Sequence, residues 1–268
     1  MALAQIRENE ATGSVAEAYA RLRRTLGVPL VNFIWRHLAT IDGALDFALP
    51  RIAQASPLID ATIPRVRQEA DALVVEHRLG AALGSQVTLS PAVRDVIAVY
   101  DRGNCWNFLA MSVLAAARAG HERSSGAPPG EASGGETAPA VPPMPRYEDL
   151  APQLRAIVDR LGSVGPAARH VGHPSLWIHL GLWPDELIAL EAPCAQLLAS
   201  PAFARAYASF RSRGPALLGL QAPEPGSEAL PGEQPLDRSI RLFRTLIAEM
   251  ILVGRVLLHA SPTRGVSN

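Results

Sequence analysis

The chain has 268 residues, of which 48% are hydrophobic and 19% are charged. This composition is too apolar for an intrinsically disordered protein and is sufficient for a hydrophobic core. Basic and acidic residues both number 25, so no net charge favours nucleic acid or an acidic membrane surface as a partner. We therefore expect a soluble globular protein with neither of these partners.

Two cysteines, Cys105 and Cys194, lie far apart without metal-type spacing, which fits a reduced cytoplasmic protein better than a disulfide scaffold. The first ten residues carry three charges and no apolar segment, so no signal peptide is expected. The longest apolar run, 240–258, contains four charged residues. It is typical of a buried amphipathic helix rather than a membrane span.

The first half of the chain predicts a series of helices. Capping-box spacing at Ser14–Glu17 predicts a helix that ends at Gly27. The apolar stretch 30–49 predicts two helices with a short break near Asp42 and Gly43. The three prolines that follow, at positions 50, 57 and 64, predict short helical pieces.

Ser90 followed by proline begins a further helix, since serine is a good N-cap and proline fits the first helical position. The Arg-Gly-Asn sequence at 102–104 predicts an interruption before another helix over 105–119. Residues 121–146 are rich in Pro, Gly, Ser, Ala and Glu and lack aromatic residues, so they bury too little surface to offset their ordering entropy. We predict a flexible linker over 121–146 between a first helical repeat, 1–120, and a second, 147–268.

Three segments of the second half echo the first half in the same order. Residues 153–162 (QLRAIVDRLG) loosely repeat 18–27 (AYARLRRTLG), and His179–Leu187 runs in register with His37–Leu45. The 237–259 region matches 90–119 in position, with Phe243 aligned to Tyr100. Such repetition indicates internal duplication. No segment alternates with period two, so we predict an all-α fold: two fused helical repeats that form a pseudo-dimer with a pocket between them.

Several short motifs occur in a fixed order along nearly the whole chain, the linker excepted. They are VPLVNF at 28–33, RHLAT at 36–40, RGN at 102–104, GHPS at 172–175 with Trp183-Pro184, and LIAE at 246–249. Together they resemble the group I 2-haloacid dehalogenases, the helical pseudo-dimer type of DL-2-haloacid dehalogenase. This resemblance implies a pocket for small 2-halocarboxylic acids of either hand, with no metal and no cofactor. It also implies hydrolysis in which an Asp-activated water attacks the halogen-bearing carbon directly.

Residue by residue, the resemblance places the family's water-positioning Asn at Asn104 and keeps an aromatic wall residue at Phe33. The catalytic Asp should follow the Pro-Ser pair, where this chain has Leu176. Leucine cannot accept a proton, so the family's mechanism lacks its base at this position. Leu30 stands where the family has a pocket Trp, and Phe243 where it has a pocket Tyr. All these changes make the expected pocket more apolar.

Two histidines are candidate substitute bases, because His173 and His179 lie three residues either side of Leu176 and imidazole is a competent base near neutral pH. The competing and favoured interpretation makes His173 a cap or turn residue and gives His179 the packing role of His37. Together with His170 these histidines are weak metal-ligand candidates. No Asp, Glu or Cys accompanies them at fixed spacing, so no metal is expected.

Glu249, inside the apolar final helix, needs a partner if it is buried. Arg36, Arg244 or backbone amides are candidate partners, and structural pairing is favoured over catalysis. Asn104 is assigned to the pocket, although it could instead cap the following helix. Two functions stay open: a dehalogenase-type hydrolase with an unidentified base, or a homologue without hydrolysis that binds a small apolar or carboxylate ligand. Homo-oligomerisation is also left open.

Overall fold

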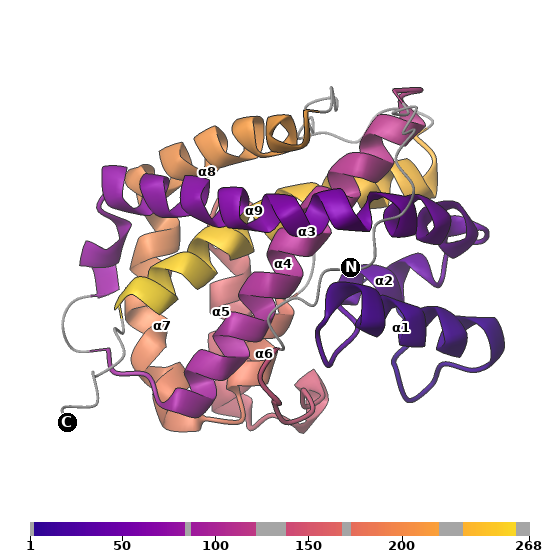
Figure 1. Cartoon of the computed structure of the whole chain (residues 1–268). Helices are drawn as coiled ribbons and strands as arrows, with labels where there is room; N and C mark the ends of the chain where they lie inside the picture. The colour runs from indigo at the N-terminus through magenta and orange to yellow at the C-terminus, as the bar shows by residue number, and fades with distance from the viewer. Residues whose placement is uncertain (1–2, 84–86, 122–137, 168–172, 220–232, 261–268) are drawn as a thin grey trace, which may run out of the picture.

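The computed structural model describes residues 3–83, 87–121, 138–167, 173–219 and 233–260 (Figure 1). This part of the chain is helical and contains no strand, which confirms the all-α prediction. In chain order the elements are α1 (Gly13–Leu26), α2 (Phe33–Leu38), α3 (Ala44–Glu76), η1 (Leu79–Leu83), α4 (Pro91–Arg118), η2 (Tyr147–Asp149), α5 (Pro152–Ser163), α6 (Ser175–Leu180), α7 (Pro184–Ala199), α8 (Pro201–Arg213), η3 (Gly214–Leu218) and α9 (Pro235–Ala260).

Helix α3 is continuous over 33 residues, so the prediction of short pieces is wrong there. Its prolines, Pro50, Pro57 and Pro64, are spaced by seven residues and therefore share one face. That face is exposed or half-buried, whereas residues such as Ile52 and Ile59 on the other side are buried. Water can satisfy carbonyls that proline leaves unpaired on a solvent face, so packing of the buried face keeps the helix intact.

Helix α4 is also continuous, so the predicted interruption at Arg102-Gly103-Asn104 is wrong and Asn104 is not a cap. The helix begins as predicted, with Ser90 Oγ accepting a hydrogen bond from the Val93 amide at 3.3 Å. Gly103 lies within the helix and allows another side chain to pack closely against it. A Cβ at this position would lie 3.1 Å from Asn32 Nδ2, so the glycine makes room for the Asn32 side chain.

The two halves interlock at the centre of the molecule, where α4 packs along α9 (Figure 1). The short helix of each half contacts the last helix of the other half: α2 packs on α9 and α6 packs on α4. The His37 ring lies 5.8 Å from the Phe243 ring, and the His179 ring lies 5.7 Å from the Tyr100 ring. These reciprocal contacts are consistent with the predicted pseudo-dimer.

An extended segment precedes the first helices of each half, and a histidine holds it in place. His37 Nδ1 lies 2.8 Å from the Ala4 carbonyl oxygen, and His179 Nε2 lies 2.9 Å from the Pro142 carbonyl oxygen. Residues 138–146, within the predicted linker, are therefore packed against the folded body, with Val141 against the core. Residues 122–137 lie outside the described residues, and the division into two repeats stays a prediction.

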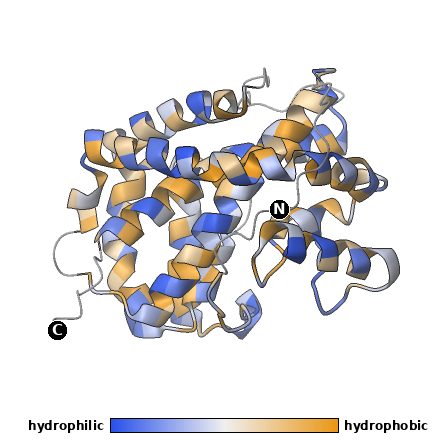
Figure 2. Ribbon diagram, in the orientation of Figure 1, coloured by the Kyte–Doolittle hydropathy of each residue, from blue (hydrophilic) through white to orange (hydrophobic). Residues whose placement is uncertain are grey.

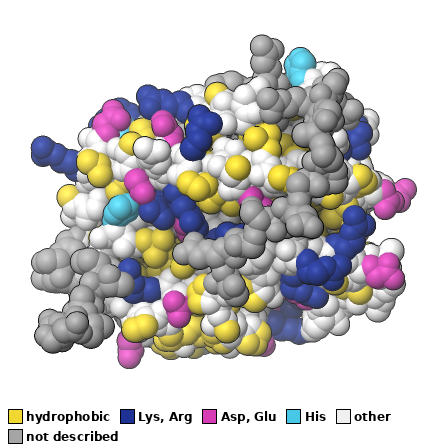
Figure 3. All heavy atoms as spheres, viewed as in Figure 1, with side chains coloured by type: hydrophobic (Ala, Val, Ile, Leu, Met, Phe, Trp, Pro, Cys, Tyr) yellow, Lys and Arg dark blue, Asp and Glu magenta, His cyan; other side chains and the backbone are white. Residues whose placement is uncertain are grey.

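Apolar side chains fill the interior, among them Trp35, Trp106 and Trp177, each with no exposed surface. Figure 2 colours the ribbon by hydropathy and shows hydrophobic and hydrophilic residues alternating along the helices. Cys105 and Cys194 are both buried and free. Among the described residues no single helix is both long and apolar enough to cross a membrane. The bent pair of α7 with α8 and η3 meets this test on length and composition only. Basic, acidic and apolar side chains are interspersed on the face that Figure 3 shows.

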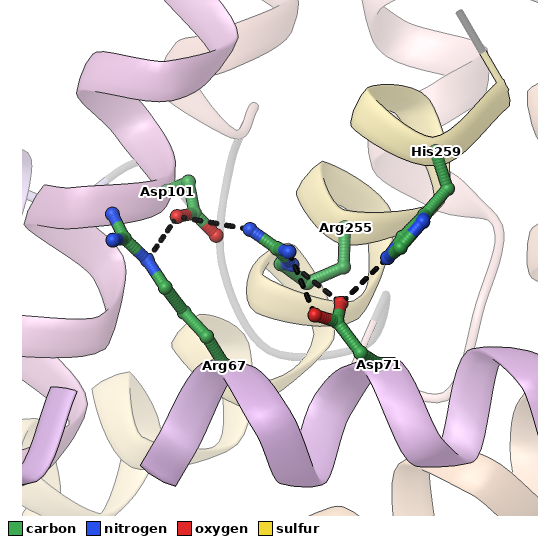
Figure 4. A network of polar contacts seen from close by, with 5 residues as sticks. All are labelled: Arg67, Asp71, Asp101, Arg255 and His259. Atoms are coloured by element: carbon green, nitrogen blue, oxygen red, sulfur yellow. Dashed lines mark hydrogen bonds and ion pairs between the residues drawn. The ribbon is translucent and has the colours of Figure 1, made fainter. Parts of the chain in front are cut away.

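A polar network joins α3, α4 and α9 (Figure 4). Arg255 donates two hydrogen bonds to Asp71, at 2.7 and 2.8 Å, and its Nη1 lies 3.5 Å from Asp101. Arg67 donates to Asp101 at 2.7 Å, and His259 Nε2 lies 2.8 Å from Asp71. Burial would raise the pKa of Asp71, but the hydrogen bonds from Arg255 and His259 lower it overall. The Asp71 carboxylate is thus held ionised between its partners, whereas burial raises the pKa of Asp101 despite its contacts with Arg67 and Arg255. The network fixes the two central helices against α3.

Candidate functional site

Two adjoining cavities lie at the seam between the halves. We call them the small cavity, about 80 Å³, and the large cavity, about 500 Å³. They share four wall residues, Asn32, Phe33, Tyr100 and Ser175. The small cavity exceeds the space that one water molecule needs, and the large one falls in the range of ligand pockets. Both cavities have walls from the two halves of the chain, as the sequence predicted for the pocket, and the division into repeats stays a prediction.

Most of the predicted site residues line the small cavity. Phe33 reaches it from α2, Asn104 from α4, Leu176 from α6 and Phe243 from α9. His173, two residues before α6 begins, also lines it. Four helices that are distant in sequence therefore meet at one point. Leu30 lines the large cavity instead. His179 lines neither.

Leu176 is 2% exposed and lies in the first turn of α6. Its aliphatic side chain forms part of the small cavity wall. An aliphatic group offers no proton acceptor, so any base that serves this cavity has to come from another element.

His173 is held by groups outside the cavity. Its ring stacks on Tyr147 with centroids 4.4 Å apart, and its Nδ1 lies 3.4 Å from the Asp159 carboxylate. The side chain is 35% exposed. These contacts suit the turn role better than that of a base beside Leu176.

His179 lines neither cavity, so the structure gives it no access to the site as a base. Its ring is fully buried, and because a carbonyl only accepts, Nε2 must donate the hydrogen bond to Pro142. Burial lowers the pKa of His179, so the neutral ring is favoured. The residue has the packing role that the echo with His37 predicted. The third histidine, His170, lies outside the described residues.

Glu249 is the acid that the small cavity contains. Its side chain comes from α9, is 5% exposed and lines the cavity with Asn104. Its Oε2 accepts a hydrogen bond from the Ala167 amide at 2.8 Å, which is one of the partner types that the sequence predicted. Burial raises the pKa of Glu249 to about 7, against a smaller lowering by the Ala167 hydrogen bond. Near neutral pH the carboxyl group is therefore poised between its two protonation states.

Gly165 sets the position of this carboxylate. Its φ of +106° is a backbone conformation that favours glycine, and a Cβ there would lie 2.8 Å from Glu249 Oε2. The loop after α5 can thus approach the carboxylate closely enough for the Ala167 amide to donate. Sequence reasoning placed Glu249 in an apolar helix but missed its access to the cavity.

Three further wall residues, Asn32, Tyr100 and Asn107, lie in or next to the motifs on which the resemblance rests. Asn32 and Asn107 were missed, and Tyr100 was predicted only as a core or wall residue. Asn32 is 8% exposed, and its Oδ1 has no hydrogen-bond partner among the described residues. The Tyr100 hydroxyl donates to the Ser175 carbonyl at 3.3 Å, and burial raises the pKa of Tyr100 well above its usual range. Asn107 accepts a hydrogen bond from Trp35 Nε1 at 2.7 Å. Within the residues described, no group of three or more His, Cys, Asp or Glu side chains is arranged to hold a metal ion.

The wall of the small cavity is built largely from matched positions of the two halves. The sequence register that aligns His37 with His179 and Tyr100 with Phe243 also aligns most of the lining residues in pairs. These pairs are Asn32 with Pro174, Phe33 with Ser175, Ile34 with Leu176, Tyr100 with Phe243, Asn104 with Ile247 and Asn107 with Met250. The cavity therefore lies where the two echoing halves face each other.

No protein-family model matches the chain, and neither does any curated protein. Solved structures match the chain over nearly its whole length. A D-2-haloacid dehalogenase mutant aligns with a TM-score of 0.73 at 16% identity, covering 96% of this chain and 94% of its own. The enzyme's mutant with D-2-CPA (15% identity) and the enzyme with L-LA (16%) also align with TM-scores of 0.73, each covering 96% of this chain and 95% of its own. At this identity the likeness concerns the fold alone, and the chain has the all-helical fold of the D-2-haloacid dehalogenases.

Proposed function

We propose that the protein is a hydrolase that removes the halide from a small 2-halocarboxylic acid in the small cavity, with Glu249 acting as the base. The observation that carries the proposal is the presence of Asn104 and the Glu249 carboxylate in the wall of one cavity. The fold shared with D-2-haloacid dehalogenases supports it.

In the proposed reaction Glu249 takes a proton from a water molecule while the water oxygen forms a bond to C2. The carbon–halogen bond breaks, and its electron pair leaves with the halide. A 2-hydroxy acid, a halide ion and a protonated Glu249 result, and Glu249 then releases its proton to solvent. Asn104 orients the water through its side-chain amide. No covalent bond to the protein forms.

The surroundings of Glu249 suit this role. A carboxylate that is 5% exposed keeps little of its hydration, which makes it a stronger base than a carboxylate in water. The aliphatic and aromatic wall formed by residues such as Leu176 and Phe243 limits the water that competes for the reacting carbon.

Halide release from each enantiomer of 2-chloropropionate tests the proposal. Asn104→Ala should lower kcat, because the attacking water loses its positioning group. Glu17→Gln, an exposed acid on α1, serves as a matched surface control and should retain the wild-type rate. Wild-type protein that releases no halide from either enantiomer, or an Asn104→Ala variant as active as wild type, would contradict the proposal.

A second candidate is a homologue that binds a small apolar or carboxylate ligand without hydrolysis. Leu176 favours it, because the position to which the resemblance assigns the catalytic Asp carries an aliphatic side chain. This candidate predicts that the wild-type protein binds 2-chloropropionate without releasing chloride and that Leu176→Asp gains the activity.

A further inference from the structure

The large cavity contains a buried charge that the proposed reaction does not use. Arg36, on α2, is 9% exposed and lines this cavity. Its Nε is buried without a partner, and its guanidinium forms no hydrogen bond or ion pair with any described residue. The guanidinium makes a cation–π contact with the Phe33 ring, whose centroid lies 5.8 Å from Arg36 Cζ.

The acidic residue in the same wall is already engaged. Glu8 accepts a hydrogen bond from Arg23 at 2.6 Å and another from the Val31 amide at 2.8 Å. Two more arginines, Arg7 and Arg146, also line the cavity. Arg7 itself pairs with Glu148 at 3.3 Å. The Arg36 guanidinium, which has lost most of its hydration, is therefore surrounded by charged groups that are engaged elsewhere.

A buried and unpaired charge is costly, and proteins compensate it with an opposite charge or retain it for a ligand. Burial also lowers the pKa of Arg36 from its ordinary value, and the nearby Tyr100 and Glu8 offset this only in part. The walls next to Arg36 are apolar, formed by Leu30, Val141, Met144 and Ile178. A single buried guanidinium beside a hydrocarbon wall suits a monoanion with an apolar chain better than a multiply charged phosphate.

We infer that the large cavity binds the carboxylate of an organic acid at Arg36, and that the ligand is longer than a three-carbon acid. From Arg36 the acid extends past Phe33 and Tyr100, which line both cavities, toward Asn104 in the small cavity. The inference rests on the proposed function for the site of reaction, whereas binding of the anion requires no turnover.

Binding is measured with hexanoate, its neutral isostere hexanamide and inorganic phosphate, by calorimetry and thermal unfolding. At about ten times its dissociation constant hexanoate should raise the Tm by roughly 3–5 °C, and hexanamide should not. Arg36→Met should weaken hexanoate binding about 10- to 100-fold. It should also raise the Tm of the ligand-free protein, since it removes an uncompensated charge.

Arg24→Gln, an exposed arginine on α1, is the matched control and should bind hexanoate as wild type does. If Arg36→Met does not fold, Arg36→Lys replaces it. This variant should bind hexanoate more weakly than wild type does, but more tightly than it binds hexanamide. Equal hexanoate affinity in wild type and Arg36→Met, equal binding of hexanamide, or tighter binding of phosphate would each overturn the inference.

The two proposals fail separately. With 2-chlorohexanoate, Arg36→Met should raise KM with little change in kcat. Glu249→Gln should lower kcat and leave hexanoate affinity unchanged. Hexanoate binding that depends on Arg36 in a protein that releases no halide would overturn the hydrolysis alone. Halide release with a KM that is unaffected by Arg36→Met would overturn the anion site alone.

Discussion

The two halves of the molecule present equivalent positions to the small cavity but different chemistry. The first half contributes Asn32, Tyr100, Asn104 and Asn107, and the matched residues of the second half are Pro174, Phe243, Ile247 and Met250. In the same register Arg36 in the large cavity matches Ile178. At these positions the first half supplies the polar side chain and the second half the apolar one, whereas the pair of Phe33 and Ser175 has the opposite order.

Two further pairs depart from the pattern of a polar residue in the first half and an apolar residue in the second. Leu176 matches Ile34, so at the position where the resemblance implies the catalytic Asp both halves are aliphatic. Glu249 matches Trp106, a fully buried ring, and is the acid of the otherwise apolar half. A repeated scaffold can therefore hold a reactive group at more than one point of the same cavity, because the fold depends on the packed positions and not on which half carries the polar groups.

The strongest test of this difference between the halves is the removal of the Glu249 carboxylate. Glu249→Gln keeps the side-chain size and the acceptor for the Ala167 amide but cannot take a proton. General base catalysis contributes about 10²- to 10⁴-fold, so kcat for halide release should fall by this factor. Wild-type kcat should rise about tenfold per pH unit up to the Glu249 pKa of about 7 and then level off. Rates recorded from pH 5 to 9 measure both effects, and an unchanged profile in the variant would exclude Glu249 as the base.

The base can also be moved to the matched aliphatic pair. In the Glu249→Gln background, Leu176→Asp should raise halide release at least about tenfold over Glu249→Gln alone, because a carboxylate again faces the cavity. Ile34→Asp, the equivalent change in the other half, is the matched comparison. Equal rescue by both would show that the two walls are interchangeable and would contradict the asymmetry.

The same glutamate should make stability depend on pH. Its folded pKa of about 7 lies above the ordinary value of 4.5, so the folded state binds the proton more tightly than the unfolded state. The stability that Glu249 contributes should be fully present below about pH 4.5 and be lost as the pH rises through about 7, by up to about 3 kcal/mol. Urea unfolding at pH 5 and pH 8 should show this loss in wild type and in Glu17→Gln, but not in Glu249→Gln.

Gly165→Ala should disturb the Glu249 carboxylate without altering the chemistry of the cavity wall. The added Cβ would collide with Oε2 at a φ that disfavours other residues, at a cost of about 1–3 kcal/mol. Urea unfolding measures this cost. Gly219→Ala, also at positive φ but with no atom within 4 Å of the added Cβ, separates backbone strain from the collision. Equal losses in both variants would show that Glu249 is not positioned by this contact.

The smallest effect should come from making one matched pair identical. Tyr100→Phe removes the hydrogen bond to the Ser175 carbonyl and gives both halves a phenylalanine at this point. The loss should be about 1 kcal/mol in the free energy of unfolding, measured by urea denaturation. No loss would mean that the hydroxyl contributes nothing to the packing of α6 on α4.

Several features followed from local pattern alone. The absence of period-two alternation, the Ser90-Pro91 start and the glycine after α1 identified helices and some of their ends, because caps and breakers act over a few residues. The shared packing role of His37 and His179 was visible in the repeat. The expectation that Phe33, Asn104 and Phe243 line one cavity came from the resemblance to the group I 2-haloacid dehalogenases, not from local pattern.

Other features depended on contacts between distant segments. Helices α3 and α4 continue through residues that usually end a helix, because their buried faces pack against the rest of the molecule. Residues 138–146 fold onto His179 although their composition is that of a linker. The sequence shows an acid at 249 and an arginine at 36. Their burial, the Ala167 amide beside one and the lack of a partner for the other arise only when both halves close around the seam, since desolvation is a property of the assembled fold.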